Sequence, residues 1–394
     1  MKFTLLANAE VYGPTPLGRV GVLVLDDRIV AVGKEAGAGL AAAGHEVETI
    51  DLRGLTLTPG LVDGHYHPLG GGDYEGPLGR STDIELGDLV RAGITTAVGV
   101  LGADYDSRNL SDLFMKSREL QMGGLTTFFY TGSFFLPPAT LTGAVRRDIM
   151  YVDACVGVKF AISEAMAFNS EEEMARVAVE GVHGGNLAGK PGLVHLHVGE
   201  RASSLDPLFG LIERTGLPAS AFYPTHINRS DPDHMLPAVR FVEMGGTIDL
   251  TAIMSRRGGS GTGLRIPDAL SNLLRLGVPI ERVTFTSDGN VSMPVRDERR
   301  QQVGLFLAGV DFLTDEWRAA VRECGLPFEQ MLLPVTATPA RMLRLEGKKG
   351  CIAAGADADL VAWDDDLRPR TVFARGRAMM RDGEVLAKGP FEAR

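Results

Sequence analysis

The sequence predicts an α/β fold: a (β/α)8 TIM-like barrel with a small β-sandwich domain formed by the N- and C-terminal segments. Three observations predict it: strand and helix patterns alternate through the middle of the chain, eight such strands can be recognised, and short β-rich runs occupy both ends. Alternation of this kind indicates a parallel sheet. Eight repeats favour a closed barrel, with an open doubly wound sheet as the structural alternative.

The predicted barrel strands are apolar, β-rich runs of seven or eight residues. They are 60–67, 95–101, 126–133, 156–163, 193–199, 221–228, 247–253 and 283–290. Amphipathic stretches between them predict helices, including 110–122, 171–182, 205–215, 235–244 and 267–276.

Short strands are also predicted near both chain ends. Their ranges are 19–25, 28–33, 358–363 and 370–376. The first two flank the acidic turn Asp26-Asp27, which indicates a hairpin. Because chain ends often lie close together, the two segments are expected to form one small β domain. The predicted division assigns 1–58 and 345–394 to this domain and 59–344 to the catalytic barrel.

Composition is that of an ordinary globular protein, with 44% hydrophobic and 23% charged residues among 394. The net charge of −10 argues against a nucleic-acid partner, and no Lys/Arg-rich run points to a membrane partner. Three cysteines without a C-x-x-C pair argue against a disulfide framework and favour a cytoplasmic location. The apolar stretch at 3–7 is shorter than the roughly 7–15 residues of a secretory signal.

Polar side chains occur near the ends of five predicted strands, where such barrels build their active sites. These are His65 and His67 on the first strand, Lys159 on the fourth, His195 and His197 on the fifth, His226 on the sixth and Asp288 on the eighth.

The His65-x-His67 pair predicts a metal site, because residues two apart on a strand face the same side and can chelate one ion. Imidazole and carboxylate ligands suit zinc and related divalent metals. A pair of hydrogen-bonded core histidines is the alternative for this motif alone. The other polar strand ends favour the metal site.

Lys159 lies within an apolar run, where a buried cation needs a partner or a shifted pKa. A neutral amine there can react with carbon dioxide to form a carbamate, which is a carboxylate-like bridging ligand. In isolation, a lysine that extends along a strand edge to water is the favoured interpretation.

On the fifth strand, His197 lies nearer the strand end and is the predicted ligand, whereas His195 is expected to orient a ligand. His45, His183 and His234 fall in predicted loops or helices and are interpreted as surface residues.

Several motifs together resemble the amidohydrolase superfamily, and within it the bacterial isoaspartyl (β-aspartyl) dipeptidases. The superfamily motifs are the segment 58–67, which ends in His65-x-His67, and the tail 350–361. The dipeptidase-like stretches are 69–72, 156–159, 189–192, 197–199, 224–229, 245–249 and 287–290. The resemblance covers nearly the whole chain.

The resemblance implies a binuclear metal site, with two divalent ions for which zinc is the natural choice. His65, His67 and Asp288 would bind one ion, His197 and His226 the other, and carboxylated Lys159 would bridge them. It implies that a metal-bridged hydroxide attacks the amide carbonyl and that Asp288 is the catalytic proton shuttle. A homo-oligomer is expected by the same analogy.

The substrate-binding residues match the dipeptidases only in part. Arg229 and Ser292 stand where those enzymes hold a substrate carboxylate, which predicts a small-molecule substrate with such a group. The glycine run, with Gly71 and Gly72, is expected to lead into the amino-group site, where Tyr74 replaces the family's glutamate beside Glu75.

Two further positions differ from the dipeptidases. Phe134 replaces a loop tyrosine that assists the carbonyl oxygen, and Met166 replaces a second carboxylate-binding arginine. Either neighbours such as Tyr66, Tyr130, Arg256 or Arg257 compensate, or the substrate is different.

Isoaspartyl dipeptide hydrolysis is the leading functional hypothesis. An N-acyl-amino-acid deacylase or a cyclic amidase of the same superfamily is the alternative. Lys159 argues against the deaminases, which usually use one metal without a bridging lysine. A non-catalytic scaffold is the remote alternative, disfavoured because all six ligand types are retained.

Overall fold

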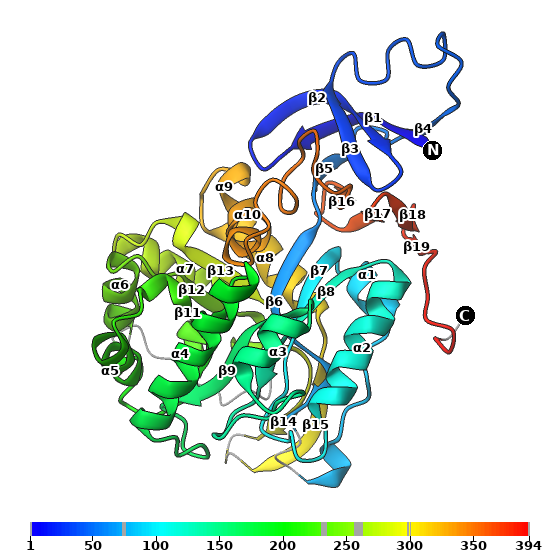
Figure 1. The fold of residues 1–394 in the computed structure, drawn as a ribbon. Coiled ribbons are helices and arrows are strands. Elements are labelled where there is room, and N and C mark those ends of the chain that lie inside the picture. The colour runs from blue at the N-terminus through cyan, green and yellow to red at the C-terminus, as the bar shows by residue number, and fades with distance from the viewer. Residues whose placement is uncertain are drawn as a thin grey trace.

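The computed structural model describes residues 2–72, 76–229, 235–255, 263–297, 299 and 301–392. An α/β body forms the larger part of the molecule, and a sheet at one end contains strands from both chain termini (Figure 1).

The α/β body is a TIM-like barrel. Six strands pair in parallel in the order β6-β7-β8-β9-β10-β11, and β12 pairs in parallel with β13. Within the described part of the chain, β12 also lies against β11, and β13 against β6. The strands are β6 (Leu61–Gly71), β7 (Ile94–Gly99), β8 (Thr126–Gly132), β9 (Cys155–Ile162), β10 (Leu193–Val198), β11 (Phe222–Thr225), β12 (Ile248–Thr251) and β13 (Val283–Thr286).

These strands are buried on both faces, which explains their continuous apolar sequences. The main hydrophobic core fills the space between strands and helices. A second cluster, which includes Val62, Tyr130, Val156, Leu193 and Leu343, fills the amino-terminal end of the barrel. Polar residues occupy the opposite end of the barrel, at the carboxyl ends of the strands.

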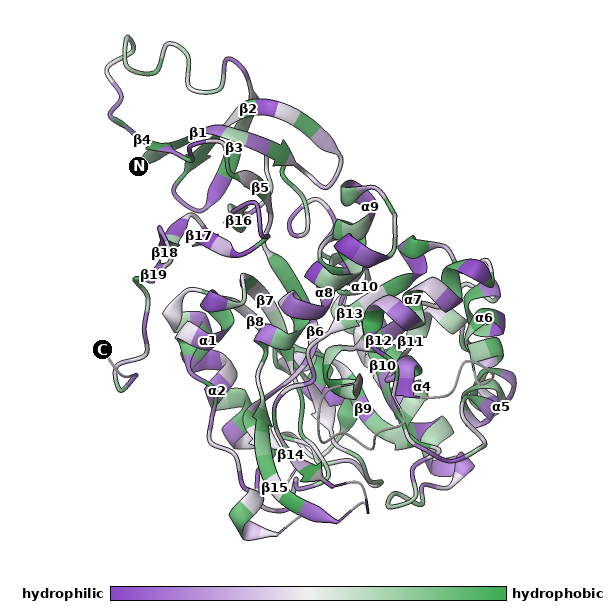
Figure 2. Cartoon of the chain, turned by 180° about the vertical axis from the view of Figure 1, so that it is seen from behind, coloured by the Kyte–Doolittle hydropathy of each residue, from purple (hydrophilic) through white to green (hydrophobic). Residues whose placement is uncertain are grey.

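Helices follow the barrel strands and cover their outer side (Figure 1). In α5 and α6, hydrophobic and hydrophilic stretches alternate, as expected for helices with one face on the barrel (Figure 2). Their bounds are α1 (Leu86–Arg91), α2 (Leu110–Gly123), α3 (Val145–Tyr151), α4 (Glu171–Ala188), α5 (Asp206–Thr215), α6 (Leu236–Glu243), α7 (Ile266–Arg275), α8 (Asp311–Glu323), α9 (Phe328–Leu332) and α10 (Ala337–Met342).

Local sequence determines where these helices begin and end. The Ser170 hydroxyl accepts a hydrogen bond from the amide of Glu173 and caps α4, and left-handed Gly189 ends it. The five predicted helices are present, and α4 runs six residues beyond the predicted end at Val182. Glycine disfavours a helix, but Gly184 and Gly185 lie in close packing here, where a Cβ would meet the backbone of Arg146 and Gly192.

The two chain ends share one sheet, which has nine strands among the described residues. Its order is β19-β18-β17-β16-β5-β1-β2-β3, with β4 paired to β1. Its strands are β1 (Phe3–Tyr12), β2 (Pro16–Leu25), β3 (Arg28–Gly33), β4 (Val47–Asp51), β5 (Thr56–Pro59), β16 (Leu360–Trp363), β17 (Pro369–Ala374), β18 (Arg377–Arg381) and β19 (Glu384–Val385).

The predicted hairpin is the β2–β3 pair, and the predicted pairing of the chain ends is made by β5 with β16. A two-layered sandwich and the domain boundaries at 58 and 345 stay predictions.

One hairpin near the carboxyl ends of the barrel strands was not predicted. It consists of β14 (Gly289–Arg296) and β15 (Gln302–Ala308), and β14 pairs with the last part of β6. The predicted eighth strand, 283–290, therefore covers β13 and the first residues of β14. The first strand also continues past His67 to Gly71.

No helix in the described ranges is both long and apolar enough to cross a membrane.

Candidate metal centre

The predicted ligands come together at the carboxyl ends of the barrel strands. His65 and His67 lie on β6, Lys159 on β9 and His197 on β10, while His226 follows β11 and Asp288 follows β13. All six are nearly or fully buried. His226 and Asp288 have left-handed backbones, with φ of 67° and 50°. Such conformations are uncommon for non-glycine residues, although Asp and His adopt them more readily than most, and they cluster at functional sites.

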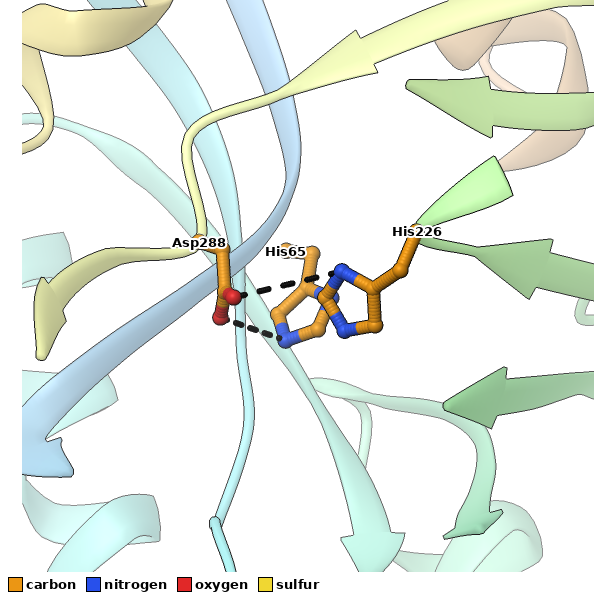
Figure 3. A group of neighbouring side chains, drawn as sticks. All are labelled: His65, His226 and Asp288. Atoms are coloured by element: carbon orange, nitrogen blue, oxygen red, sulfur yellow. Dashed lines mark ion pairs between the residues drawn. The ribbon is translucent and has the colours of Figure 1, made fainter. Parts of the chain in front are cut away.

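One group of ligand atoms meets at Asp288. Its Oδ1 lies 3.2 Å from Nε2 of His65 and 3.1 Å from Nε2 of His67. Figure 3 shows the Asp288 carboxylate directed toward both rings, with one oxygen paired to His65 and the other to His226. The distance from Asp288 Oδ2 to His226 Nδ1 is 4.0 Å. A carboxylate and two imidazoles that converge in this way form a donor set suited to a divalent metal.

A second group is formed by His197 and His226. Nδ1 of His197 lies 2.9 Å from Nε2 of His226. The other ring nitrogen of His226, Nδ1, lies 2.8 Å from the Thr251 hydroxyl. That contact fixes the ring of His226 with Nε2 toward His197.

Lys159 is beside the first group. Its Nζ lies 3.4 Å from His65 Nε2 and donates a hydrogen bond to the Leu101 carbonyl at 3.0 Å. Nζ also lies over the Phe134 ring, 5.3 Å from its centre. Burial lowers the pKa of Lys159 to about 7. A neutral amine is therefore accessible near neutral pH, as carbamate formation requires.

The electrostatics of the cluster also suit a cation. Burial, together with neighbouring positive groups, lowers the pKa of His197 and His226 well below the usual value, which keeps both rings neutral. Burial alone would raise the pKa of Asp288, but His65 and His67 outweigh it and hold that pKa well below its ordinary value. Neutral imidazoles and an ionised carboxylate are the protonation states that metal binding needs.

Further buried polar residues contact the predicted ligands and the backbone next to them. The Asp63 carboxylate accepts hydrogen bonds from the amides of His65 and Ser287, and so ties β6 to the residue before Asp288. His195 contributes Nε2 at 3.1 Å from Nδ1 of His65. Its ring stacks on Tyr130, with ring centres 4.8 Å apart. These contacts place His195 beside a predicted ligand, and its orienting role stays a prediction.

The predicted substrate residues lie partly around this cluster. Nη1 of Arg229 is 3.4 Å from Nε2 of His197, and the Phe134 ring centre is 4.2 Å from that of His197. Gly71 adjoins the site, since a Cβ added there would lie 2.8 Å from Nδ1 of His67. A Cβ on Gly72 would collide with the Ser292 carbonyl, which places Gly72 against β14. Tyr74 and Glu75 lie outside the described residues.

Two of the neighbours considered as compensating for the lost tyrosine and arginine lie in the described part of the chain. Tyr66 alternates with His65 and His67 on β6 and is buried in the main hydrophobic core, and Tyr130 is stacked on His195. Met166, which stands in place of the lost arginine, is 59% exposed. Arg256 and Arg257 lie outside the described residues.

Glu164 was missed by the sequence prediction. Its Oε2 lies 3.2 Å from Nε2 of His197 and 3.8 Å from Nη1 of Arg229. The available signal was an acidic residue just beyond the strand that carries Lys159.

Comparison with known proteins identifies the class. Residues 266–385 match the family model described as the amidohydrolase family. The chain belongs to this family and is a hydrolase, as its likeness to solved hydrolase structures indicates.

The chain is similar to a beta-aspartyl dipeptidase from Fervidobacterium islandicum AW-1, solved in complex with a beta-Asp-Leu dipeptide. The identity is 35%, the match covers 97% of this chain and 98% of that one, and the TM-score is 0.87. A second structure of the Fervidobacterium enzyme matches at 33% identity, with a TM-score of 0.86 and the same coverage. The D-hydantoinase of Streptomyces coelicolor is 26% identical over 87% of this chain and 81% of its own length.

Proposed function

We propose that this protein hydrolyses an amide bond in small substrates that carry a carboxylate, with β-aspartyl dipeptides as the nearest class. The observation that carries the proposal is the buried meeting of two histidine pairs with Asp288 and Lys159 at the strand ends. The likeness to the dipeptidase at 35% identity supports the same substrate class.

The ligand set fits two divalent metal ions, with zinc the natural choice for this mixture of nitrogen and oxygen donors. His65, His67 and Asp288 would hold one ion, and His197 and His226 the other. Such ions lower the pKa of water and polarise a carbonyl when bound.

We assign Lys159 a bridging role through carboxylation. The neutral Nζ would add its lone pair to the carbon of carbon dioxide and lose one proton to solvent. The product carries one negative charge. Burial supports this role, because it holds the pKa of Lys159 near 7 and so keeps a nucleophilic amine available.

Asp288 is our candidate for the proton shuttle. Its carboxylate is ionised and lies at the centre of the cluster. It would accept a proton from the attacking water and pass it to the leaving amine. Proximity rather than basicity would make this transfer effective, since a carboxylate with a lowered pKa is a weak base.

Arg229 is the candidate for binding the substrate carboxylate, because a guanidinium offers paired donors and lies beside His197. Ser292, Gly71 and Gly72 are proposed to line the same region. A homo-oligomeric assembly and a cytoplasmic location stay predictions from the sequence.

An N-acyl-amino-acid deacylase or cyclic amidase is the second candidate. It is favoured by Phe134, which is buried beside His197 and Lys159 and has no hydroxyl to assist a carbonyl oxygen. It is also favoured by exposed Met166, which cannot bind a carboxylate.

A substrate panel at matched zinc loading separates the candidates. It contains β-Asp-Leu, N-acetyl-leucine and a hydantoin, and kcat/KM is measured for each. We expect β-Asp-Leu to have the highest value. A clear preference for N-acetyl-leucine or the hydantoin would transfer the assignment to the second candidate, and no hydrolysis of any of the three would contradict both.

A further inference from the structure

The backbone near Glu164 fixes the position of this residue beside the candidate metal centre. It follows β9 by two residues, and Ser163 between them has a left-handed backbone with φ of 51°. Its backbone is pressed against Gly199, where an added Cβ would lie 2.4 Å from the Glu164 Cα. Gly199 is two residues beyond His197, so this close approach brings Glu164 next to the histidine.

The Glu164 carboxylate contacts two residues of the proposed site. Oε2 is 3.2 Å from His197 Nε2 and 3.8 Å from Arg229 Nη1. The side chains of Glu164 and His197 are 13% and 7% exposed, so water competes little for the contact. The other oxygen, Oε1, accepts a hydrogen bond from the amide of Met166, which fixes the carboxylate group.

The contact with Glu164 bears on which nitrogen of His197 carries the proton. With the Glu164 oxygen as the acceptor, the proton of this hydrogen bond lies on Nε2 of His197. Nδ1 is then left with a lone pair, and it faces Nε2 of His226 at 2.9 Å. We infer that Glu164 is a positioning residue that holds His197 in the Nε2–H tautomer, with Nδ1 ready to bind a divalent metal. The inference rests on the proposed role of His197 as a metal ligand.

The position of Arg229 explains why loss of Glu164 would change the tautomer of His197. Nη1 of Arg229 lies 3.4 Å from the same His197 Nε2, and a guanidinium only donates. Without Glu164, this contact would favour a bare Nε2 and move the proton to Nδ1. The proton would then occupy the nitrogen that faces His226. Glu164 prevents this by accepting the hydrogen bond of His197 Nε2 and by pairing its charge with the Arg229 guanidinium.

The first measurement is metal affinity, by competition of the protein with a zinc chelator. Carboxylates that orient metal-bound histidines typically contribute about 10- to 100-fold in affinity. We expect Glu164→Ala to weaken zinc binding by such a factor. Glu164→Gln keeps an acceptor oxygen and should recover part of the loss. Glu172→Ala, an exposed glutamate on α4, serves as the matched control and should bind zinc as the parent does.

The second measurement is the tautomer itself, by NMR of the metal-free protein labelled with 15N-histidine. The His197 signal is identified by its loss in His197→Asn. We expect Nε2–H in the parent and a shift toward Nδ1–H in Glu164→Ala. If Glu164→Ala fails to fold, Glu164→Gln takes its place, and a parent spectrum with Nδ1–H still overturns the inference.

The inference is overturned if His197 of the parent carries its proton on Nδ1, or if Glu164→Ala binds zinc within twofold of the parent. Failure of the proposed function is distinguishable, because the parent itself would then bind no divalent metal. In that case the tautomer spectrum would still report whether Glu164 orients His197.

Discussion

Asp249, on β12, is a buried carboxylate that is connected to the candidate metal centre through Thr225. Oδ2 accepts hydrogen bonds from the hydroxyls of Thr225 and Thr286, and Oδ1 accepts one from Thr284. Thr225 precedes His226 in the chain, so the network supports a proposed ligand. Burial outweighs these hydrogen bonds and raises the pKa of Asp249 to about 7.

A raised pKa makes stability depend on pH with a definite sign. Between about pH 4 and 7 the folded protein holds a proton on Asp249 that the unfolded chain has lost, so this contribution falls as pH rises and is gone above about 7. We expect the metal-free parent to lose about 2 kcal/mol more unfolding free energy between pH 5 and 8 than Asp249→Asn. Urea unfolding at both pH values measures the difference. Equal losses in the two proteins would show that Asp249 is ionised throughout.

Asp288 tests the catalytic chemistry more directly. Asp288→Asn keeps an oxygen donor but cannot carry a proton between water and the leaving amine. General acid–base groups contribute about 10²- to 10⁴-fold to rate. We expect kcat to fall within this range while zinc content, measured by mass spectrometry of the metal, changes little. Retained kcat would remove Asp288 from the shuttle role.

The ligand candidates could be predicted from sequence because strand geometry is regular. A period of two places His65 and His67 on one face, and parallel strands bring their carboxyl ends together. The sequence shows Glu164 just beyond a predicted strand, but its contact with His197 could not be predicted, because that contact depends on the left-handed turn at Ser163 and on the close approach of Gly199. The position of Tyr74 and Glu75 stays a prediction.

At the scale of elements, the turn after β9 and the end of β10 fit together through Gly199. A Cβ at this residue would lie 2.4 Å from the Cα of Glu164 and 2.5 Å from the Ser163 carbonyl, both backbone atoms. Neither atom can move without displacing the turn, so β9 and β10 must adjust together to accept a larger residue.

Gly199→Ala should therefore destabilise the protein by about 1–3 kcal/mol, as overpacking does. Gly210→Ala is the matched control, because Gly210 lies in helix α5 with no atom within 4 Å of the added Cβ. Replacing a helical glycine by alanine should stabilise by about 0.5–1 kcal/mol. Chemical unfolding of the three proteins measures both changes. The packing account is wrong if Gly199→Ala is as stable as Gly210→Ala.

The elements differ in how well their sequences reveal them. The barrel strands were predicted because they are continuously apolar. The β14–β15 hairpin was missed because its two strands mix apolar and polar residues and lack the continuous apolar run of a barrel strand. Val303, Leu305 and Leu307 in β15 are 64%, 38% and 53% exposed, so apolar residues there do not mark a buried face.

At the scale of the molecule, Trp363 joins the terminal sheet to the barrel body. It lies on β16 and its indole donates a hydrogen bond to the Thr58 hydroxyl on β5, at 2.8 Å. Its ring centre is 5.0 Å from that of Trp317 on helix α8. Both tryptophans are fully buried. The Trp363 side chain therefore connects the sheet formed by both chain ends to the α/β body.

Trp363→Ala should cost about 3–5 kcal/mol of unfolding free energy, the usual range for removal of a buried tryptophan. Phe391→Ala is the control, because Phe391 is 96% exposed near the carboxyl end. It should leave stability unchanged. Thermal unfolding followed by near-UV circular dichroism compares the variants. A loss below about 1 kcal/mol in Trp363→Ala would contradict the linking role.

The whole account depends on six buried side chains acting as one binuclear metal site. Metal analysis after zinc loading and gel filtration tests this most directly, on the parent and on Lys159→Ala with and without a short-chain carboxylic acid. We expect two zinc ions per chain in the parent, loss of metal in Lys159→Ala, and partial recovery when the acid replaces the missing bridge. A parent that retains no zinc, or a Lys159→Ala variant that retains as much as the parent, would contradict the account.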